Sequence, residues 1–481
     1  MSQINRIIGG QINYDEILSF DWNGQKLGGH PGDTLASALL ANGVQLVGRS
    51  FKYHRPRGIF SAGSEEPNAL VSLRSGAEKE PNTRATTIEL YNGLTATSQN
   101  HRGPIEWDLM AVNDLLSPFL SAGFYYKTFM WPKAFWEKIY EPIIRNSAGL
   151  GSLSGATDPD RYDHGFLHCE LLVIGAGPAG LSAALAAGRT GARVILADED
   201  FRLGGRLNAE TYAINDSACA DWAYEAVAEL ASMPNVELMS RTTVFGSFDH
   251  GIYGALERKT DHLLSAGDKP RQVLWRIYSK RALLTAGATE RSIAFGNNDR
   301  PGIMLAGAVR TYLNRFGVAS GKRVAVFTNN EDGLQTARDL DAKGLDVCAI
   351  VDSRKGEAIV DTAGRKALRS ITLNDGRKIE TDCLAVSGGW SPNLHLTCHH
   401  RSRPGWNEDI AGFVPDNNRP PGMEVAGAAN GTMTLGAALT DGHDRAAKLA
   451  QDLGHSGKPG KAASADDEVF ATSAYWHVKD S

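Results

Sequence analysis

Residues 169–200, CELLVIGAGPAGLSAALAAGRTGARVILADED, contain a strand, a glycine turn, a helix and a second strand in one continuous run. The turn GAGPAG, at 175–180, directly follows the apolar run LLVI and opens an alanine-rich helix. Gly175 permits the tight turn, Gly177 lets the backbone approach a pyrophosphate, and Gly180 lets the helix pack closely on the strand. The helix N-terminus adds unpaired N–H groups that attract phosphate. This stretch therefore predicts an α/β dinucleotide-binding unit.

The end of the second strand carries the acidic residues that such a unit needs. Asp198 and Glu199 lie 23 and 24 residues after Gly175. A carboxylate at this point can hold the two hydroxyls of a ribose and disfavours a 2′-phosphate, so NAD or FAD is favoured over NADP. The following Gly205 and Arg206 could add backbone and guanidinium contacts to phosphate. A glycine turn without a ligand is the alternative that this combination disfavours.

A second, similar run begins at residue 321 with GKRVAVFTNNEDGLQTARDLDAKGLDVCAIVDS. Its turn reads TNNEDG, at 328–333, so Glu331 and Asp332 stand where a pyrophosphate would approach. We expect the strand–helix–strand shape to survive and dinucleotide binding to be lost. Two working sites could pass hydride from NAD(P)H to a flavin, whereas this chain is expected to have only one.

Two later segments are expected near the first turn. TAGATER, at 285–291, ends a strand at a glycine turn that should return the chain to the pyrophosphate. Gly427 and Ala428, followed by Thr432 and Thr434, precede a helix where such a fold closes over the dinucleotide. Ordinary tight turns are the alternative in both places.

Composition limits the remaining functions. The 481 residues are 42% hydrophobic and carry a net charge of −5, which suits about three domains and excludes a globally basic nucleic-acid binder. A mean hydropathy of −0.27 and the lack of a long apolar run argue against a membrane span. We see no signal-peptide pattern at the N-terminus. Five scattered cysteines without a CxxC pair exclude a disulfide scaffold and favour a reducing cytoplasm.

The N-terminal part, 1–105, is predicted to be a small α+β unit. Short strands are expected at 18–22 and 86–91, with one helix in GDTLASALLANGV whose start Asp33 or Thr34 can cap. The chain would continue with an aromatic-rich connecting segment, a dinucleotide module whose second unit is degenerate, and a polar linker that opens a further domain. These predicted limits are 106–168 for the segment, 169–454 for the module, 321–385 for its degenerate second unit, and 455–481 for the linker.

The aromatic-rich segment is expected to pack across domains, because charged residues such as Lys133, Glu137 and Glu141 interrupt it. Upstream, RSFKYHRPRG, at 49–58, gathers cationic and aromatic side chains. This motif could contact an anion or nucleotide, or equally be a solvated loop or a subunit contact.

Recognisable catalytic motifs are absent from the sequence. It has no GxSxG elbow, HExxH helix or P-loop. Cys398, His399 and His400 lack further ligands at metal-binding spacing, so no metal site is expected. The chain is therefore predicted to hold a cofactor without carrying out chemistry itself.

Several of these segments together resemble the large (alpha) subunits of heterotetrameric sarcosine oxidases over essentially the whole chain. The most specific segment is RSFKYHRPRGI, at 49–59. The resemblance also rests on the rest of RSFKYHRPRGIFSAGSEEPNALV, on GDTLASALLANGV, on the aromatic run to SGATDPDRYDHGFLHCE, on VIGAGPAGLSAA and on GATERSIAFGNNDRPGIM. The broader family includes the large subunits of opine oxidases, hydrogen cyanide synthase and N-methylglutamate dehydrogenase.

The resemblance implies a ferredoxin-like N-terminal domain followed by a two-dinucleotide-binding-domain flavoprotein module that holds NAD where relatives hold FAD. No catalytic residue is implied in this chain. The implied NAD contacts are Gly175, Gly177, Pro178, Ala179, Gly180, Asp198, Glu199, Asp200, Gly205, Arg206, Val244, Gly427, Ala428, Thr432, Met433 and Thr434.

The resemblance also implies a complex with beta, gamma and delta subunits. Sarcosine would be oxidised to glycine in the beta subunit, which carries FAD and covalent FMN. The products would be hydrogen peroxide and either formaldehyde or, with tetrahydrofolate, 5,10-methylenetetrahydrofolate. From charge alone, an FMN at the alpha–beta interface could contact residues 52–57.

Two departures from the family pattern are visible. No cysteine precedes Cys169, so an iron–sulfur cluster in the N-terminal domain is excluded. The chain also ends close to where the folate-binding, aminomethyltransferase-like domain of an alpha subunit should begin, as in a truncated or split subunit.

Two other readings remain. The first is an FAD-bearing subunit of an opine, N-methylglutamate or related amine dehydrogenase. The second is an NAD-sensing protein whose aromatic segment binds a partner.

Overall fold

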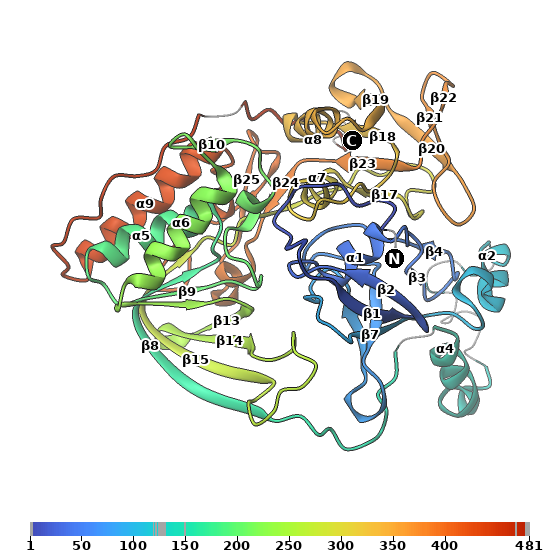
Figure 1. The fold of residues 1–481 in the computed structure, drawn as a ribbon, viewed down its shortest axis with the longest axis horizontal. Coiled ribbons are helices and arrows are strands. Elements are labelled where there is room, and N and C mark those ends of the chain that lie inside the picture. Colours follow the sequence, from blue (N-terminus) through green and yellow to red (C-terminus); the bar gives the residue numbers. More distant parts are fainter. Residues whose placement is uncertain are drawn as a thin grey trace.

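The computed structural model describes residues 3–118, 120, 123, 131–148, 151–466 and 469–476. The run before the first glycine turn forms the carboxyl end of β8, inside a seven-stranded sheet (Figure 1). The order is β12-β9-β8-β15-β14-β13, with β27 also paired to β15. The β13–β14 and β14–β15 pairs are antiparallel, and the other pairs are parallel. The strands are β8 (Tyr162–Ile174), β9 (Val194–Ala197), β12 (Val236–Met239), β13 (Thr242–Phe248), β14 (Ile252–Arg258), β15 (Gln272–Leu284) and β27 (Met423–Val425).

Three helices cover one face of this sheet: α5 (Pro178–Arg189), α6 (Cys219–Ser232) and α9 (Leu435–Asp452) (Figure 1). Leu181 and Leu439 pack with Val173 in one buried core. A Cβ at Gly442 would lie 2.1 Å from the carbonyl oxygen of Ala179, so α5 and α9 approach closely only because α9 has glycine there. This helical layer fixes the position of the glycine turn.

The second unit is a four-stranded parallel sheet in the order β17-β23-β18-β19. Helices α7 (Ala306–Asn314) and α8 (Glu331–Ala342) accompany it. Its strands are β17 (Ile303–Leu305), β18 (Arg323–Thr328), β19 (Asp346–Asp352) and β23 (Cys383–Ser387), and an antiparallel sheet of β20 (Ile359–Ala363), β21 (Ser370–Leu373) and β22 (Lys378–Glu380) lies beside them. Short pairs complete the fold: β3 (Gly48–Arg49) with β4 (Pro56–Arg57), β10 (Ala213–Ile214) with β11 (Ser217–Ala218), β16 (Ala288–Glu290) with β24 (Trp390–Pro392), and β25 (Gly405–Asn407) with β26 (Gly412–Val414).

The N-terminal part is a five-stranded sheet with one helix, in the order β2-β1-β7-β5-β6. Helix α1 (Leu35–Ala41) has the predicted start, with Thr34 as its N-cap, since Thr34 and Ser37 each accept the other's backbone N–H. The strands are β1 (Leu18–Trp22), β2 (Gln25–Gly29), β5 (Leu70–Leu73), β6 (Glu80–Arg84) and β7 (Thr95–Ser98). The predicted α+β character of this part is confirmed.

The strand predicted at 86–91 is wrong. These residues form only an isolated bridge between Glu89 and Thr34. The N–H of Leu35 donates to the carbonyl of Ile88 at 2.8 Å, so the backbone here serves the start of α1 instead of a sheet.

The N-terminal sheet and the second unit share one hydrophobic core. Phe20 and Leu39 are buried in the same cluster as Tyr312 and Phe316, at the end of α7. The Arg6 guanidinium donates to the Asp33 carboxylate and to the carbonyl of Phe316 across the same contact. The N-terminal part is therefore held against the module by buried apolar area.

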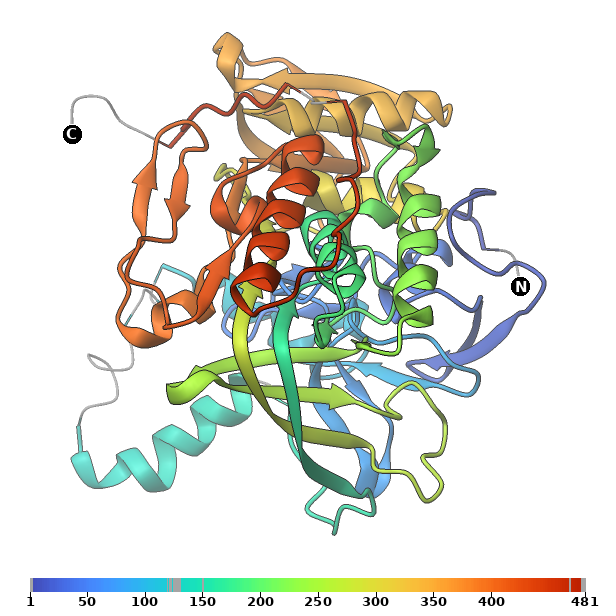
Figure 2. The ribbon, with the colours of Figure 1, turned by 90° about the vertical axis from the view of Figure 1, so that its left-hand side faces the viewer.

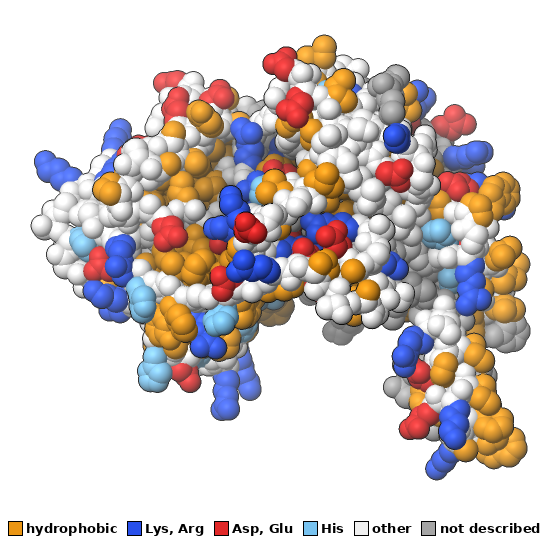
Figure 3. Space-filling view, turned by 60° about the horizontal axis from the view of Figure 1, so that its bottom comes forward, with side chains coloured by type: hydrophobic (Ala, Val, Ile, Leu, Met, Phe, Trp, Pro, Cys, Tyr) orange, Lys and Arg blue, Asp and Glu red, His pale blue; other side chains and the backbone are white. Residues whose placement is uncertain are grey.

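The described part of the aromatic-rich segment includes α2 (Val112–Leu115) and α4 (Glu141–Ala148), and α4 projects from the body (Figure 2). Trp131 is 83% exposed and Ile143 58% exposed, and hydrophobic side chains gather along the projecting arm in Figure 3. Packing across domains was predicted for this segment. Residues 131–148 extend away instead, whereas Trp107, near the start of the segment, lies under Arg365 and Lys366 of the second unit. Residues 119, 121, 122, 124–130, 149 and 150 of the segment lie outside the described residues. In the described chain, no helix is both long and apolar enough to cross a membrane.

After α9 the chain runs back along the helical layer toward the second unit (Figure 2). The backbone of Ser464 exchanges hydrogen bonds with Asn215, and His455 contacts the Glu170 carboxylate at 2.8 Å. Residues 469–476 then lie against the second unit, where Thr472 pairs with Asn330. The predicted linker is thus in contact with the module along much of its described length.

Candidate dinucleotide site

A cavity of about 1290 Å³ opens at the carboxyl ends of β8 and β9, facing the second unit. This is the edge where open α/β sheets bind ligands. Fourteen of the sixteen residues predicted to contact NAD line it; Gly180 and Gly427 lie behind the lining. The fourteen are Gly175, Gly177, Pro178, Ala179, Asp198, Glu199, Asp200, Gly205, Arg206, Val244, Ala428, Thr432, Met433 and Thr434.

The three glycines of the first turn meet different constraints. Gly175 has φ +103°, and a Cβ there would lie 2.6 Å from the carbonyl oxygen of Thr285. A Cβ on Gly180 would lie 1.8 Å from the carbonyl oxygen of Gly175. A Cβ on Gly177 would meet nothing within 4 Å, because it would point into the cavity. Two of these glycines therefore shape the turn, and Gly177 leaves room for a ligand.

The helix that follows keeps its first N–H groups available. Gly177 is the N-cap of α5 and no described side chain caps this end. The N–H groups of Ala179 and Gly180 have no partner within the helix, and the helix dipole places positive potential there. Space, donors and potential together fit a pyrophosphate, so the residues present fit an adenine dinucleotide.

The three acidic residues after β9 have separate tasks. Asp198 accepts the backbone N–H of Ala176 at 2.6 Å and that of Asp200 at 2.8 Å, so it stabilises the turn. Asp200 forms a two-contact ion pair with Arg315, at 2.5 and 2.9 Å. Glu199 is the exposed carboxylate that faces the cavity. The ribose contact predicted for this acidic end therefore fits Glu199 best.

The surroundings also shift proton affinities here. Burial raises the pKa of Asp198 to about 6, although the N–H of Ala176 opposes the shift. Burial alone would raise the pKa of Asp200, but the Arg315 guanidinium outweighs it and holds that pKa below its usual value. The acidic end thus carries less than its full formal charge near pH 6.

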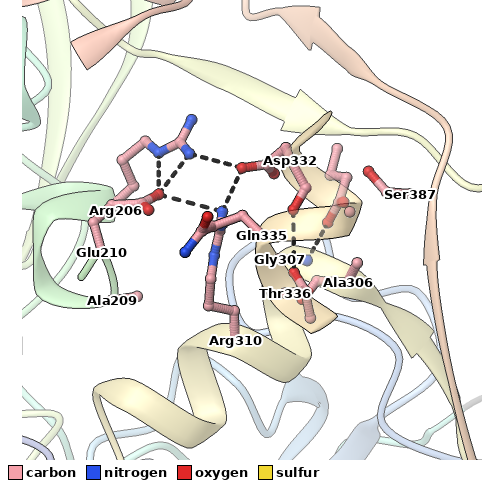
Figure 4. A network of polar contacts seen from close by, with 12 residues as sticks. Arg206, Ala209, Glu210, Ala306, Gly307, Arg310, Asp332, Gln335, Thr336 and Ser387 are labelled. Atoms are coloured by element: carbon pink, nitrogen blue, oxygen red, sulfur yellow. Dashed lines mark hydrogen bonds and ion pairs between the residues drawn. The ribbon is translucent and has the colours of Figure 1, made fainter. Parts of the chain in front are cut away.

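Arg206 joins the two units through a network of ion pairs (Figure 4). Its guanidinium donates to Glu210 at 2.6 Å and to Asp332 at 3.1 Å, and it lies over the Trp390 ring. Arg310, from α7, contacts both carboxylates from the other side. The predicted phosphate contact of Arg206 would therefore come from a guanidinium already held by two carboxylates.

Two buried carboxyl groups beside this network differ in proton affinity. Burial favours the neutral form of Asp332, but the Arg310 and Arg206 guanidinium groups outweigh it and lower its pKa to about 2. Burial and the nearby Asp332 raise the pKa of Glu290 to about 8, while Glu290 accepts the N–H of Gly307 at 2.7 Å. Asp332 thus brings a lasting negative charge into the cavity wall.

The loop before α9 is held by a residue that sequence reasoning missed. Asp441 accepts the N–H of Gly427 at 2.9 Å and the hydroxyl of Thr432 at 3.3 Å. A Cβ on Gly427 would lie 2.6 Å from the Cβ of Ala179, so this loop approaches α5 closely. The chain therefore closes over the first turn as predicted.

Other cavity residues were also missed because they are brought in from distant parts of the chain. Ser64 and Glu65 come from the N-terminal part, and the others come from β13, from β24 and the residues just after it, from α8 and from the C-terminal segment. They include Thr242, Thr243, Phe245, Gln335, Arg338, Trp390, Ser391, Asn393, His395, Val469 and Phe470. For Ser64 and Glu65 the sequence held a signal, since both lie in the stretch RSFKYHRPRGIFSAGSEEPNALV.

The corresponding place in the second unit is filled. Asn330 is the N-cap of α8, and its side chain accepts the N–H of Gly333 at 3.1 Å. The N–H of Ser473 donates to the carbonyl of Asn329, whose side-chain amide donates to the carbonyl of Ser473 at 2.5 Å. Thr328, Asn329 and Asn330 are all buried, so the chain itself covers this edge.

The cationic motif at 49–58 has intramolecular partners. Arg55 and Arg57 both contact Asp299, at 3.2 and 2.5 Å, and His54 contacts Asp108 at 2.6 Å. Arg49 is buried and donates to the carbonyl of Ile105. These contacts favour the structural reading of the motif; the FMN contact stays a prediction without support from this geometry.

Comparison with known proteins agrees with both folded parts. Residues 15–101 match a family model described as a 2Fe-2S iron–sulfur cluster binding domain, and residues 170–246 match one described as an FAD dependent oxidoreductase. The chain is 51% identical over 463 residues to the sarcosine oxidase subunit alpha of Rhizobium meliloti (strain 1021), covering 92% of this chain and 47% of that protein. It is homologous to sarcosine oxidase alpha subunits. A second such subunit, from Corynebacterium sp. (strain U-96), is 37% identical over 90% of this chain and 43% of its own length.

The chain therefore spans about half the length of the curated relatives it matches. Their name, subunit alpha, implies an assembly of several subunits. Among solved structures, L-proline dehydrogenase from P. horikoshii superposes with a TM-score of 0.68 at 18% identity, covering 95% of this chain and 77% of that one. This likeness confirms the predicted fold class of a ferredoxin-like domain followed by a dinucleotide-binding module.

Residues 15–101 match a cluster-binding domain but lack the cysteines that would bind an iron–sulfur cluster. Clusters of this type are held by cysteine thiolates, and residues 1–168 contain none. In the described part of the chain, no group of three or more metal-binding side chains was found. The domain keeps the fold without the ligands.

Proposed function

We propose that this chain is the NAD-binding part of a sarcosine oxidase alpha subunit. One observation carries the proposal: the uncapped N-terminus of α5 opens at Gly177 into a cavity whose far side presents the Glu199 carboxylate. These groups match the pyrophosphate and the unphosphorylated ribose of NAD. The contacts predicted from sequence, including the loop at 427–434, are proposed for that nucleotide.

The chain would bind one dinucleotide and would hold the complex together rather than oxidise the amine. In the second unit, the Asn330 side chain and the backbone of Ser473 occupy the edge where another dinucleotide would bind. The amine oxidation is proposed for a beta subunit carrying FAD and FMN, with gamma and delta subunits completing the complex. Sarcosine would become glycine, with hydrogen peroxide and either formaldehyde or 5,10-methylenetetrahydrofolate as the other products.

A second candidate, an FAD-bearing subunit of an amine or opine dehydrogenase, is favoured by one finding. Residues 170–246 match the FAD dependent oxidoreductase model, and FAD shares the adenosine and pyrophosphate of NAD. In that case the same cavity would hold a flavin.

The decisive experiment is to denature the purified protein and identify the released nucleotide by chromatography, mass and absorbance. One NAD per chain without flavin supports the proposal; FAD supports the second candidate and contradicts NAD. Identification of the subunits that copurify with this chain tests the proposed assembly with beta, gamma and delta subunits. The predicted limit at 168 falls inside β8, which begins at Tyr162 and pairs with β15 from there on, so the module starts earlier than predicted. Limited proteolysis tests the proposed limits at residues 105 and 454.

A further inference from the structure

The segment GIFSAGSEEPNA, at 58–69, lies in the stretch RSFKYHRPRGIFSAGSEEPNALV, one of those that carry the family resemblance. It lies in the N-terminal part between β4 and β5. Two of its residues, Ser64 and Glu65, line the dinucleotide cavity more than a hundred residues away in sequence from the glycine turn. The N-terminal part therefore supplies one wall of the candidate site.

A buried carboxylate gives this loop a defined shape. Glu66 is 1% exposed and accepts four backbone N–H groups, with distances of 2.7 to 3.0 Å. Burial raises the pKa of Glu66, although the four N–H groups oppose the shift. The four donors are those of Phe60, Ser61, Asn68 and Ala69. Such a loop presents Ser64 in one position because its backbone is tied on both sides of that residue.

The loop is also held from both parts of the chain. The Tyr312 hydroxyl, on α7 of the module, donates to the carbonyl of Ser61 at 2.9 Å, and Thr86 of the N-terminal part donates to the carbonyl of Gly63 at 2.7 Å. On the other side of the contact, Arg258 donates to the carbonyls of Thr87 and Glu199 at 3.0 and 2.6 Å. Loop and acidic strand end are therefore fixed relative to each other.

At the centre of this contact, the Ser64 hydroxyl donates to one carboxylate oxygen of Glu199 at 2.6 Å. A hydroxyl has a single proton to donate, so Ser64 uses it on Glu199. The other carboxylate oxygen of Glu199 remains able to accept hydroxyls of a ribose. A hydrogen bond to an ionised group is among the stronger kinds.

We propose that Ser64 is a positioning residue that orients the Glu199 carboxylate toward the adenosine ribose and so makes the N-terminal part a determinant of nucleotide selectivity. This rests on the proposed function of the cavity. A carboxylate held in place accepts the 2′- and 3′-hydroxyls of NAD and repels a 2′-phosphate. The exposed Glu65 adds a second negative charge on the same wall.

The experiment uses the protein as purified, with any subunits that accompany it. Exchange of bound nucleotide against labelled NAD is followed for wild type, Ser64→Ala and Ser64→Thr, with NADP as competitor. Ser64→Ala is expected to release NAD about 10-fold faster, because a hydrogen bond to a charged group is lost. It should also lower the preference for NAD over NADP about 10-fold, since a freed Glu199 can turn away from a 2′-phosphate. Ser64→Thr keeps the hydroxyl and should remain close to wild type.

Ser61→Ala is the matched control, because it removes a hydroxyl from the same loop whose contact with Glu66 is long, at 3.4 Å. It should change neither quantity. Unchanged exchange and selectivity in Ser64→Ala would overturn the proposal, as would an equal loss in Ser61→Ala.

Failure of the proposed function would be seen separately. If wild type carries FAD, the NAD assignment is wrong, and release of FAD then tests Ser64: faster release in Ser64→Ala supports its role, and equal release overturns it. A wild type without any adenine dinucleotide overturns both.

Discussion

The two dinucleotide-type units share a backbone plan and differ at the residue that begins their helix. In the first, Gly177 leaves the N-terminus of α5 uncapped and open to a cavity. In the second, Asn330 caps α8 with its own side chain. A helix end can bind phosphate only while its N–H groups are unclaimed. The cap at Asn330, together with the segment around Ser473, therefore closes the helix end of the second unit, whereas that of the first stays open.

The third glycine of the turn, in contrast, is the same in the two units. A Cβ on Gly180 would lie 1.8 Å from the carbonyl oxygen of Gly175, and one on Gly333 would lie 2.3 Å from the hydroxyl oxygen of Thr328. Both units keep this glycine, because close packing of helix on strand requires it whether or not a ligand binds. Its presence in a sequence indicates the fold more than the function.

The acidic strand ends differ in the same way. Glu199, after β9, faces the cavity, whereas Asp352, at the end of β19, accepts the backbone N–H and the guanidinium of Arg354. Arg354 also contacts Glu331 at 2.7 Å. At this strand end of the second unit, Asp352, Arg354 and Glu331 satisfy one another.

The largest expected effect follows from the shared glycine. Gly180→Ala and Gly333→Ala should each destabilise the protein, Gly180→Ala by about 3 kcal/mol, since a backbone atom has to move. Only Gly180→Ala should also release the nucleotide. Chemical unfolding and nucleotide analysis of the two variants check this. Wild-type stability in Gly180→Ala would contradict the packing role.

Gly177→Asn copies the second unit's cap into the first. Its backbone angles, φ −73° and ψ −167°, suit any residue, so stability should stay equal or rise by about 1 kcal/mol. Nucleotide affinity should fall about 100-fold, or roughly 2.8 kcal/mol, because the side chain takes the phosphate's place. Titration calorimetry and thermal unfolding measure the two quantities.

Gly191→Asn is the matched control for that variant. Gly191 follows the other end of α5, has φ +91°, and would place a Cβ in open space. Asparagine tolerates this conformation, so nucleotide affinity should not change. Equal losses of affinity in both variants would show that α5 was disturbed as a whole.

The raised pKa of Asp198, in the first unit, predicts that the free energy of unfolding depends on pH. Its pKa of about 6 in the folded protein exceeds about 3.9 in an unfolded chain. Between these values the folded state binds the extra proton, so stability rises as pH falls from 7 to 4. Relative to Asp198→Asn, the ligand-free wild type should gain about 2 kcal/mol over that range. An unfolding difference that does not change with pH would contradict this.

The smallest effect concerns the segment that covers the second unit. Asn329→Ala removes the amide that donates to the carbonyl of Ser473, a loss of about 1 kcal/mol. Hydrogen exchange of residues 469–476 should become faster. Bound nucleotide should stay at one per chain, since Asn330 still caps α8. A second equivalent would show that the segment alone closes that unit.

Much of the fold could be predicted because its signals are local. The turn GAGPAG, the cap of α1 at Thr34 and the strand 18–22 each depend on neighbours within a few residues. The strand predicted at 86–91 failed because its backbone groups bond to Asp33 and Leu35, fifty residues earlier. A strand-like sequence pattern does not reveal which other segment of the chain its backbone will hydrogen-bond with.

The candidate site divides in the same way. The sequence by itself determined the open turn, the acidic strand end and the absence of cluster cysteines, since each depends on residue type and spacing. Only the tertiary structure decided that Ser64 meets Glu199, that Arg206 is held by Glu210 and Asp332, and that the C-terminal segment covers the second unit. Hydrogen bonds and ion pairs between distant residues form only after packing brings them within about 3 Å, and no local pattern records that approach.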